Sequence, residues 1–143
     1  MTDRAMRPLR GTTAVRTLVV DDSPELLEVF CALLALHPGI EIVGTARDGV
    51  EALQAWAELQ PELVLMDVTM PQMDGITAAM LLAEMPEPPR VILMSSHDLR
   101  ENELESSASR AEAFVFKPQF RQQFPIAFQA ALAGMGCPTI GVS

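Results

Sequence analysis

Five short apolar segments recur along the chain, and turn-forming or charged residues bound each of them. Each segment has four to seven positions, most of them aliphatic or β-branched, which is typical of strands buried on both faces of a parallel sheet. The segments are TLVV (17–20), IEIVGTA (40–46), LVLM (63–66), VILM (91–94) and AFVF (113–116). Because the second segment mixes polar with apolar positions, we expect it at an edge of the sheet.

Helix-start signals lie in the stretches between these segments. Ser23 before Pro24 predicts an N-cap and a first helical residue, and Asp48 followed by Glu51 predicts a capping box. Helices are expected over about 24–37, 49–59, 75–85 and 99–110, with a last helix from near Pro125. The fourth has a weak apolar face, so we expect it to be the least stable.

The strict alternation of strands and helices predicts a three-layer α/β fold, a doubly wound parallel sheet with right-handed crossovers. The 143 residues suffice for one domain of ordinary size. We expect this domain over 15–133, after a disordered N-terminal arm (1–14) and before a flexible C-terminal tail (134–143).

Composition and charge exclude several classes of function. Ten basic and 19 acidic side chains leave a net charge of -9, which argues against binding to a nucleic-acid backbone. No apolar stretch is long enough for a membrane span, and the first residues lack the apolar centre of a signal peptide, so we expect a cytoplasmic protein without membrane contact. The cysteines and histidines lack the spacing of a disulfide framework or a zinc site.

Polar residues follow four of the five predicted strands, at the point where each strand ends. The carboxyl ends of parallel strands lie at one edge of a sheet, and ligands of open α/β sheets bind there. These side chains should therefore share a pocket. They are Asp21, Asp22, Asp67, Ser95, Ser96 and Lys117.

Three carboxylates in one pocket need a cation or a proton. Two carboxylates about 4 Å apart repel by roughly 4 kcal/mol at an effective dielectric near 20, and Mg²⁺ suits a site built from oxygen ligands. Lys117 is the only lysine in the chain, and its compact ammonium suits a phosphoryl oxygen. A lysine that only neutralises the aspartates is the alternative, as is a helix cap for Ser95 and Ser96.

In this order and at these spacings, the residues resemble the receiver domains of bacterial two-component response regulators, chemotaxis regulators among them. The resemblance covers about 15–133 and implies a flavodoxin-like fold with strand order 2-1-3-4-5. It is carried by the acidic pair Asp21-Asp22, the phosphoacceptor Asp67, the stretches Met70-Pro71 and Met73-Asp74-Gly75, the switch residues Ser95 and Phe114, and Lys117-Pro118.

The resemblance also implies a role for each residue. Asp67 would be the nucleophile that forms an aspartyl phosphate. Asp22, Asp67 and the backbone carbonyl of Thr69 would hold Mg²⁺ directly, and Asp21 would hold it through water. The groups that would bind the phosphoryl oxygens belong to Lys117, Ser95, Thr69 and Ser96.

A protein of this kind takes its phosphoryl group from a histidine kinase or a phosphotransfer protein, and it is no enzyme beyond assisting its own phosphoryl transfer and dephosphorylation. Movement of Ser95 and rotation of Phe114 would change the face formed by the fourth helix, fifth strand and fifth helix. That face would contact a downstream protein or a second copy. Arg110 and Glu112 depart from the small, glycine-rich pattern usual there, so the choice of partner stays open.

Two other functions stay open at this point. A receiver-like module could bind proteins without phosphorylation, although the complete acidic set argues against it. A small-molecule phosphatase with an aspartate nucleophile would carry a paired aspartate where this chain has Thr69. Because no DNA-binding module is recognisable, we expect a stand-alone regulator that acts through protein contacts.

Overall fold

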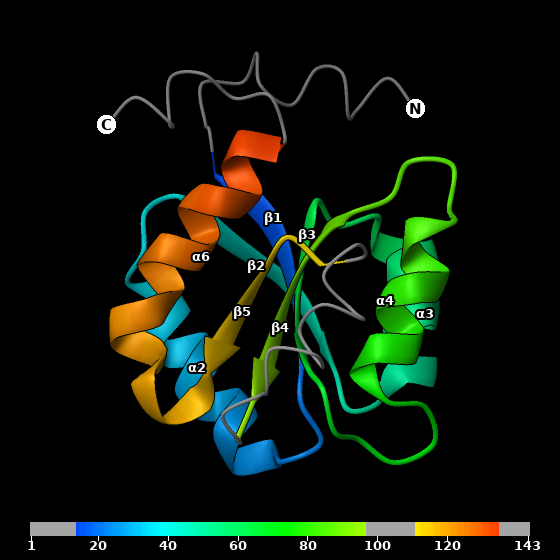
Figure 1. The fold of residues 1–143 in the computed structure, drawn as a ribbon, viewed down its shortest axis with the longest axis horizontal. Coiled ribbons are helices and arrows are strands. Elements are labelled where there is room, and N and C mark those ends of the chain that lie inside the picture. The colour runs from blue at the N-terminus through cyan, green and yellow to red at the C-terminus, as the bar shows by residue number, and fades with distance from the viewer. Residues whose placement is uncertain (1–13, 97–110, 135–143) are drawn as a thin grey trace.

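The computed structural model describes residues 14–96 and 111–134, and within them five parallel strands form one sheet in the order β2-β1-β3-β4-β5 (Figure 1). This confirms the predicted fold class and strand order. The strands are β1 (Val15–Val20), β2 (Ile40–Ala46), β3 (Leu63–Asp67), β4 (Arg90–Ser95) and β5 (Ala113–Phe116). The helices are α2 (Pro24–Ala35), α3 (Gly49–Leu59), α4 (Gly75–Ala83), the 3-10 turn η2 (Lys117–Gln119) and α6 (Phe120–Gly134).

Alternating strand residues build two apolar layers, one on each face of the sheet. Leu63 and Leu65 of β3 pack toward α2 and α6, whereas Val64 and Met66 pack toward α3 and α4, and all four are fully buried. Figure 1 shows the two pairs of helices on opposite sides of the sheet. A central strand covered on both faces has no polar position until its last residue, which explains the unbroken apolar run before Asp67.

The helix starts confirm the local signals of the sequence. Ser23 caps α2 by accepting the Leu26 N–H (3.2 Å), and Asp48 caps α3 by accepting the Glu51 N–H (2.8 Å). The capping box differs from expectation in one bond: Glu51 accepts the N–H of Arg47, the residue before the cap, at 2.9 Å. The extended backbone at the cap (φ -158°, ψ 179°) accompanies this arrangement.

The expected start of the last helix near Pro125 is wrong, because α6 begins at Phe120 and continues through that proline. The helix extends the 3-10 turn and places Phe120, Phe124 and Phe128 one turn apart, with ring centroids 5.1 and 5.5 Å apart. Burial of each ring contributes roughly 1.5–3 kcal/mol, which offsets the roughly 3 kcal/mol cost of a proline inside a helix. All three rings belong to the buried core on this face of the sheet.

Several expectations concern residues outside the described part. The predicted fourth helix (99–110), almost all of the arm and almost all of the tail lie there. In the described ranges, α2 and α4 end two residues earlier than expected, at Ala35 and Ala83. No helix within the described ranges has the length and apolar character needed to cross a membrane.

Candidate functional site

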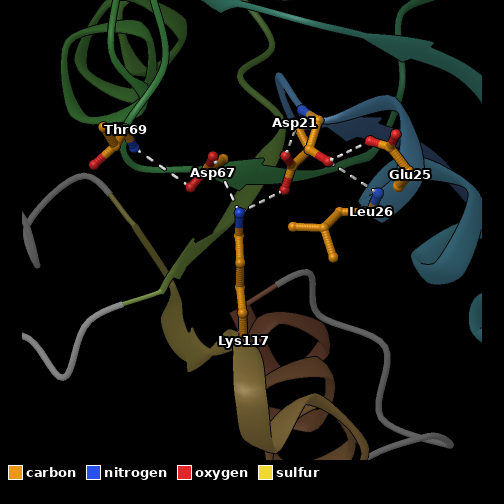
Figure 2. Close-up of polar contacts among 7 residues, drawn as sticks. Asp21, Glu25, Leu26, Asp67, Thr69 and Lys117 are labelled. Carbon is orange, nitrogen blue, oxygen red and sulfur yellow. Dashed lines mark hydrogen bonds and ion pairs between the residues drawn. The ribbon is translucent and has the colours of Figure 1, made fainter.

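Three side chains from the first, third and fifth strand units meet at the carboxyl edge of the sheet. The Lys117 ammonium lies 2.6 Å from Asp21 Oδ2 and 3.1 Å from Asp67 Oδ2. Figure 2 shows the lysine reaching up from the end of β5 to a point between the two carboxylates. All three side chains are at least nine-tenths buried, so the pairing takes place largely out of water. The convergence predicted from strand order is present.

Asp22 completes an acidic cluster with the two buried aspartates. One carboxylate oxygen from each of Asp21, Asp22 and Asp67 lies within 4.8 Å of the others, and Asp22 is the exposed member. Asp21 Oδ1 accepts the Ser23 N–H at 2.9 Å, whereas Asp21 Oδ2 has the ion pair with Lys117 but no aligned hydrogen-bond donor in the described structure. A buried oxygen with spare acceptor capacity, in an all-oxygen cluster open on one side, fits a hard divalent cation.

Burial dominates the proton affinity of the Asp67 carboxyl. Burial raises the pKa of Asp67 to about 6. The positive charge of Lys117 opposes this shift, whereas the negative charge of Asp21 adds to it. Hydrogen bonds from Lys117 and from the Thr69 N–H also lower the pKa. Near neutral pH most of the carboxyl is therefore ionised, and a bound divalent cation would favour the ionised form further. Because the side chain is also buried, Asp67 is a largely ionised carboxylate with little hydration.

The raised pKa predicts that Asp67 destabilises the cation-free fold at neutral pH. Between about pH 4 and pH 6 the folded protein holds this proton more tightly than the unfolded chain does, so the free energy of unfolding falls as pH rises through that window. Without divalent cations at pH 7, we expect Asp67→Asn to be more stable than the wild type by about 1 to 3 kcal/mol. Urea unfolding in EDTA at pH 4.5 and pH 7 checks this, and an equal difference at the two pH values would contradict it.

Gly75 holds the backbone behind Asp67 by close approach. Its N–H donates to the Val68 carbonyl at 2.8 Å, and a Cβ at this position would lie 2.0 Å from the Asp67 carbonyl oxygen. Any side chain would therefore push the α4 start away from the end of β3. The Asp74 side chain caps the same helix by accepting the Thr77 N–H at 2.8 Å.

The other predicted residues lie around this centre at different depths. Thr69 is exposed, and its N–H donates to Asp67 Oδ1 at 3.4 Å. Ser95 is buried at the end of β4, one position beyond Met94, the residue paired with Asp67. Ser96 is exposed and lines a cleft of about 490 Å³ together with Lys117, α2 and the start of α6.

The predicted aromatic switch lies farther from the acidic cluster. Phe114 is half-buried in β5 and borders a groove with Gln123, Ile126 and neighbouring alanines. The groove therefore lies on the face expected to contact a partner. Glu112, which departs from the usual pattern there, forms an ion pair with Arg90 at 3.4 Å.

Fold and site together define a flavodoxin-like α/β protein whose sheet edge carries an acidic, lysine-paired centre. The sequence model of the response regulator receiver domain matches residues 17–128. The chain belongs to this family.

Curated relatives contain the same domain as part of a longer protein. The chain is 40% identical over 121 residues to a protein-glutamate methylesterase/protein-glutamine glutaminase of Symbiobacterium thermophilum, covering 82% of this chain and 31% of that protein. A protein-glutamate methylesterase/protein-glutamine glutaminase of Myxococcus xanthus is 42% identical over 106 residues, covering 73% of this chain and 30% of that protein. The chain thus spans about a third of the length of these relatives.

Solved structures agree with the fold. The response regulator domain of Thermotoga maritima CheB superposes with a TM-score of 0.73 at 32% identity, covering 85% of this chain and 96% of that one. A CheX-CheY-BeF3-Mg+2 complex from Borrelia burgdorferi gives a TM-score of 0.78 at 27% identity, covering 92% of this chain and 98% of the matched chain.

Proposed function

We propose that the chain accepts a phosphoryl group on Asp67 and uses it to switch a protein-binding face in a two-component phosphorelay. The observation that supports this most strongly is the Lys117 ammonium held between two buried carboxylates, 2.6 Å from Asp21 and 3.1 Å from Asp67. If Lys117 served only to neutralise Asp21 and Asp67, a third acid beside them would have no role. Asp22 nevertheless lies in the same cluster, which supports a site that binds a cation as well.

In the proposed transfer, an Asp67 carboxylate oxygen attacks the phosphorus of a phosphohistidine or a small acyl phosphate. The new P–O bond forms as the bond to the donor breaks, and the donor leaves with the electron pair of that bond. Lys117 turns its ammonium to an equatorial phosphoryl oxygen, while the Thr69 and Ser96 backbones and the Ser95 hydroxyl surround the transferred group. Positioning and charge therefore account for most of the rate.

The acidic cluster is proposed to hold Mg²⁺. Asp22, Asp67 and the Thr69 carbonyl would be direct ligands, and Asp21 would act through water. When bound, the ion would neutralise charge on the phosphoryl oxygens during transfer. The CheX-CheY complex from Borrelia burgdorferi contains BeF3 and Mg²⁺, and this supports the proposal by similarity.

Exposed Asp22 offers a direct test of this ligand set. We expect Asp22→Asn to weaken Mg²⁺ binding by about tenfold or more, because it removes a charged ligand at little cost to packing. Glu28→Gln, an exposed acid in α2 outside the acidic cluster, is the matched control and should leave the affinity within twofold. Titration by isothermal calorimetry measures both, and equal affinities for the two variants would remove Asp22 from the site.

The switch is proposed to run from Ser95 to Phe114 along adjacent strands. Ser95 lies at the end of β4, and Phe114 lies opposite Leu93 on the neighbouring β5. If Ser95 moves toward the phosphate, the half-buried Phe114 ring can turn inward and change the groove that it borders on α6. A histidine kinase or phosphotransfer protein is the proposed donor. The proposed receiver of the signal is a downstream protein or a second copy.

Incubation with acetyl phosphate and Mg²⁺ tests the proposed function. We expect one labile phosphoryl group per chain, formed only with the divalent cation and located on Asp67 by mass spectrometry. Absence of an adduct under these conditions would favour a phosphorylation-independent binding module. Repeated turnover of unrelated phosphoesters would favour a phosphatase.

A further inference from the structure

The loop between β3 and α4 carries Thr69, the proposed backbone ligand of the cation, and its far end is held by another helix. Gly49, the first residue of α3, donates its N–H to the carbonyl of Met73 at 3.1 Å. This bond satisfies one of the free N–H groups at a helix start. It also ties the α3 start to a carbonyl only four residues after Thr69.

The contact between Gly49 and Met73 leaves no room for a side chain at position 49. Gly49 is buried, and a Cβ there would lie 2.6 Å from the Met73 carbonyl oxygen and 2.8 Å from the Met73 Cβ and Cγ. Its backbone lies outside the left-handed region, so glycine is required here for close approach rather than for conformation. Alanine suits the helix itself, and the strain it introduces must fall on the loop.

The loop has little freedom to absorb that strain away from the site. Its first residue continues the sheet ladder through the Val68 N–H bond to Met94 (2.8 Å), and its end is fixed where Gly75 meets Val68 (2.8 Å). Gln72 already has a φ of 68°, which is costly for a residue with a side chain. Displacement of Met73 therefore passes back toward Thr69.

We propose that Gly49 is a positioning residue for the cation and phosphoryl site, acting through the Met73 carbonyl. The inference rests on the proposed function. Mg²⁺ demands near-octahedral ligands at about 2.0–2.1 Å, so a shift of a few tenths of an ångström in the Thr69 carbonyl weakens binding. The same shift misplaces the loop around the transferred phosphoryl group and slows transfer even when the cation is saturating.

Gly49→Ala tests this inference against a matched glycine. Gly44→Ala in β2 is the control, because its Cβ would meet Leu59 Cδ1 of the same helix at 2.7 Å, a flexible side-chain end away from the loop. We expect Gly49→Ala to weaken Mg²⁺ binding by about fivefold or more and to slow phosphorylation at saturating Mg²⁺ by about tenfold. Gly44→Ala should change each by less than twofold.

Urea unfolding of both variants gives their free energies of unfolding, and so separates a displaced loop from a loss of overall stability. A Gly49→Ala protein that folds, binds Mg²⁺ and is phosphorylated within twofold of the wild type would overturn the inference. A Gly49→Ala protein that binds Mg²⁺ more weakly but is phosphorylated at the wild-type rate at saturating Mg²⁺ would also overturn it. Wild-type protein that forms no Mg²⁺-dependent adduct would instead overturn the proposed function, so the two failures are distinguishable.

A measurement on the wild type covers the case in which Gly49→Ala does not fold. The Gly49 amide resonance reports its bond to Met73, so we expect it to shift during Mg²⁺ titration with the dissociation constant found by calorimetry. The Gly44 amide should stay nearly constant. A Gly49 amide that does not respond to saturating Mg²⁺ would contradict the proposed connection.

Discussion

Asp67→Asn is expected to abolish phosphorylation, with less than about one-hundredth of the wild-type adduct after incubation with acetyl phosphate and Mg²⁺. The amide keeps the shape of the side chain but lacks the anionic oxygen that attacks phosphorus. The fold should survive, since the carboxylate is buried at a cost and its pKa is raised to about 6. Intact-protein mass spectrometry measures the adduct.

Asp48→Asn is the matched control for this substitution. It makes the same change of charge, lies outside the acidic cluster, and preserves the α3 cap because asparagine caps helices as well as aspartate does. Its adduct should equal that of the wild type. Full phosphorylation of Asp67→Asn would place the acceptor elsewhere.

Lys117→Met is expected to lower both stability and reactivity. Removing the ammonium leaves Asp21 and Asp67 buried without their counter-charge, and breaking a buried pair in this way costs about 3 kcal/mol or more. Lys117 opposes the raised pKa of Asp67, so without it that pKa rises further, the folded protein holds the Asp67 proton to higher pH, and its stability falls as pH rises. The deficit should therefore be larger at pH 8 than at pH 5.

The same variant should slow phosphorylation by about a hundredfold or more, because the charge on the phosphoryl oxygens loses its fixed partner. Arg121→Met is the control: it removes a cation one helical turn later, but from an exposed position. Stopped incubations with acetyl phosphate give both rates, and urea unfolding gives both stabilities. Equal behaviour of the two variants would show that Lys117 contributes no more than a surface charge.

The sequence predicts the sheet and the central site because both depend on strong, simple patterns. Strands covered on both faces must be apolar throughout, so their ends are visible as the first polar residues. Parallel strand order then brings Asp21, Asp67 and Lys117 to one edge, and the short distances between them follow from topology.

Local rules fail where contacts distant in sequence decide the outcome. Pro125 signals a helix start, but stacking of Phe120, Phe124 and Phe128 in the core starts α6 five residues earlier. Gly49 appears in the sequence only as part of a helix cap. Its contact with Met73 depends on how two loops approach at the sheet edge, and only the Asp48-Gly49 pair at a helix start offered a signal for it.

A crystal structure of the chain with Mg²⁺ and beryllofluoride tests the central claim most directly. We predict beryllium bonded to an Asp67 carboxylate oxygen, Mg²⁺ bound by Asp22, Asp67 and the Thr69 carbonyl, and the Lys117 ammonium hydrogen-bonded to a fluoride. A structure grown at saturating concentrations of both ions that leaves Asp67 unmodified, with Lys117 still paired only to carboxylates, would contradict the account.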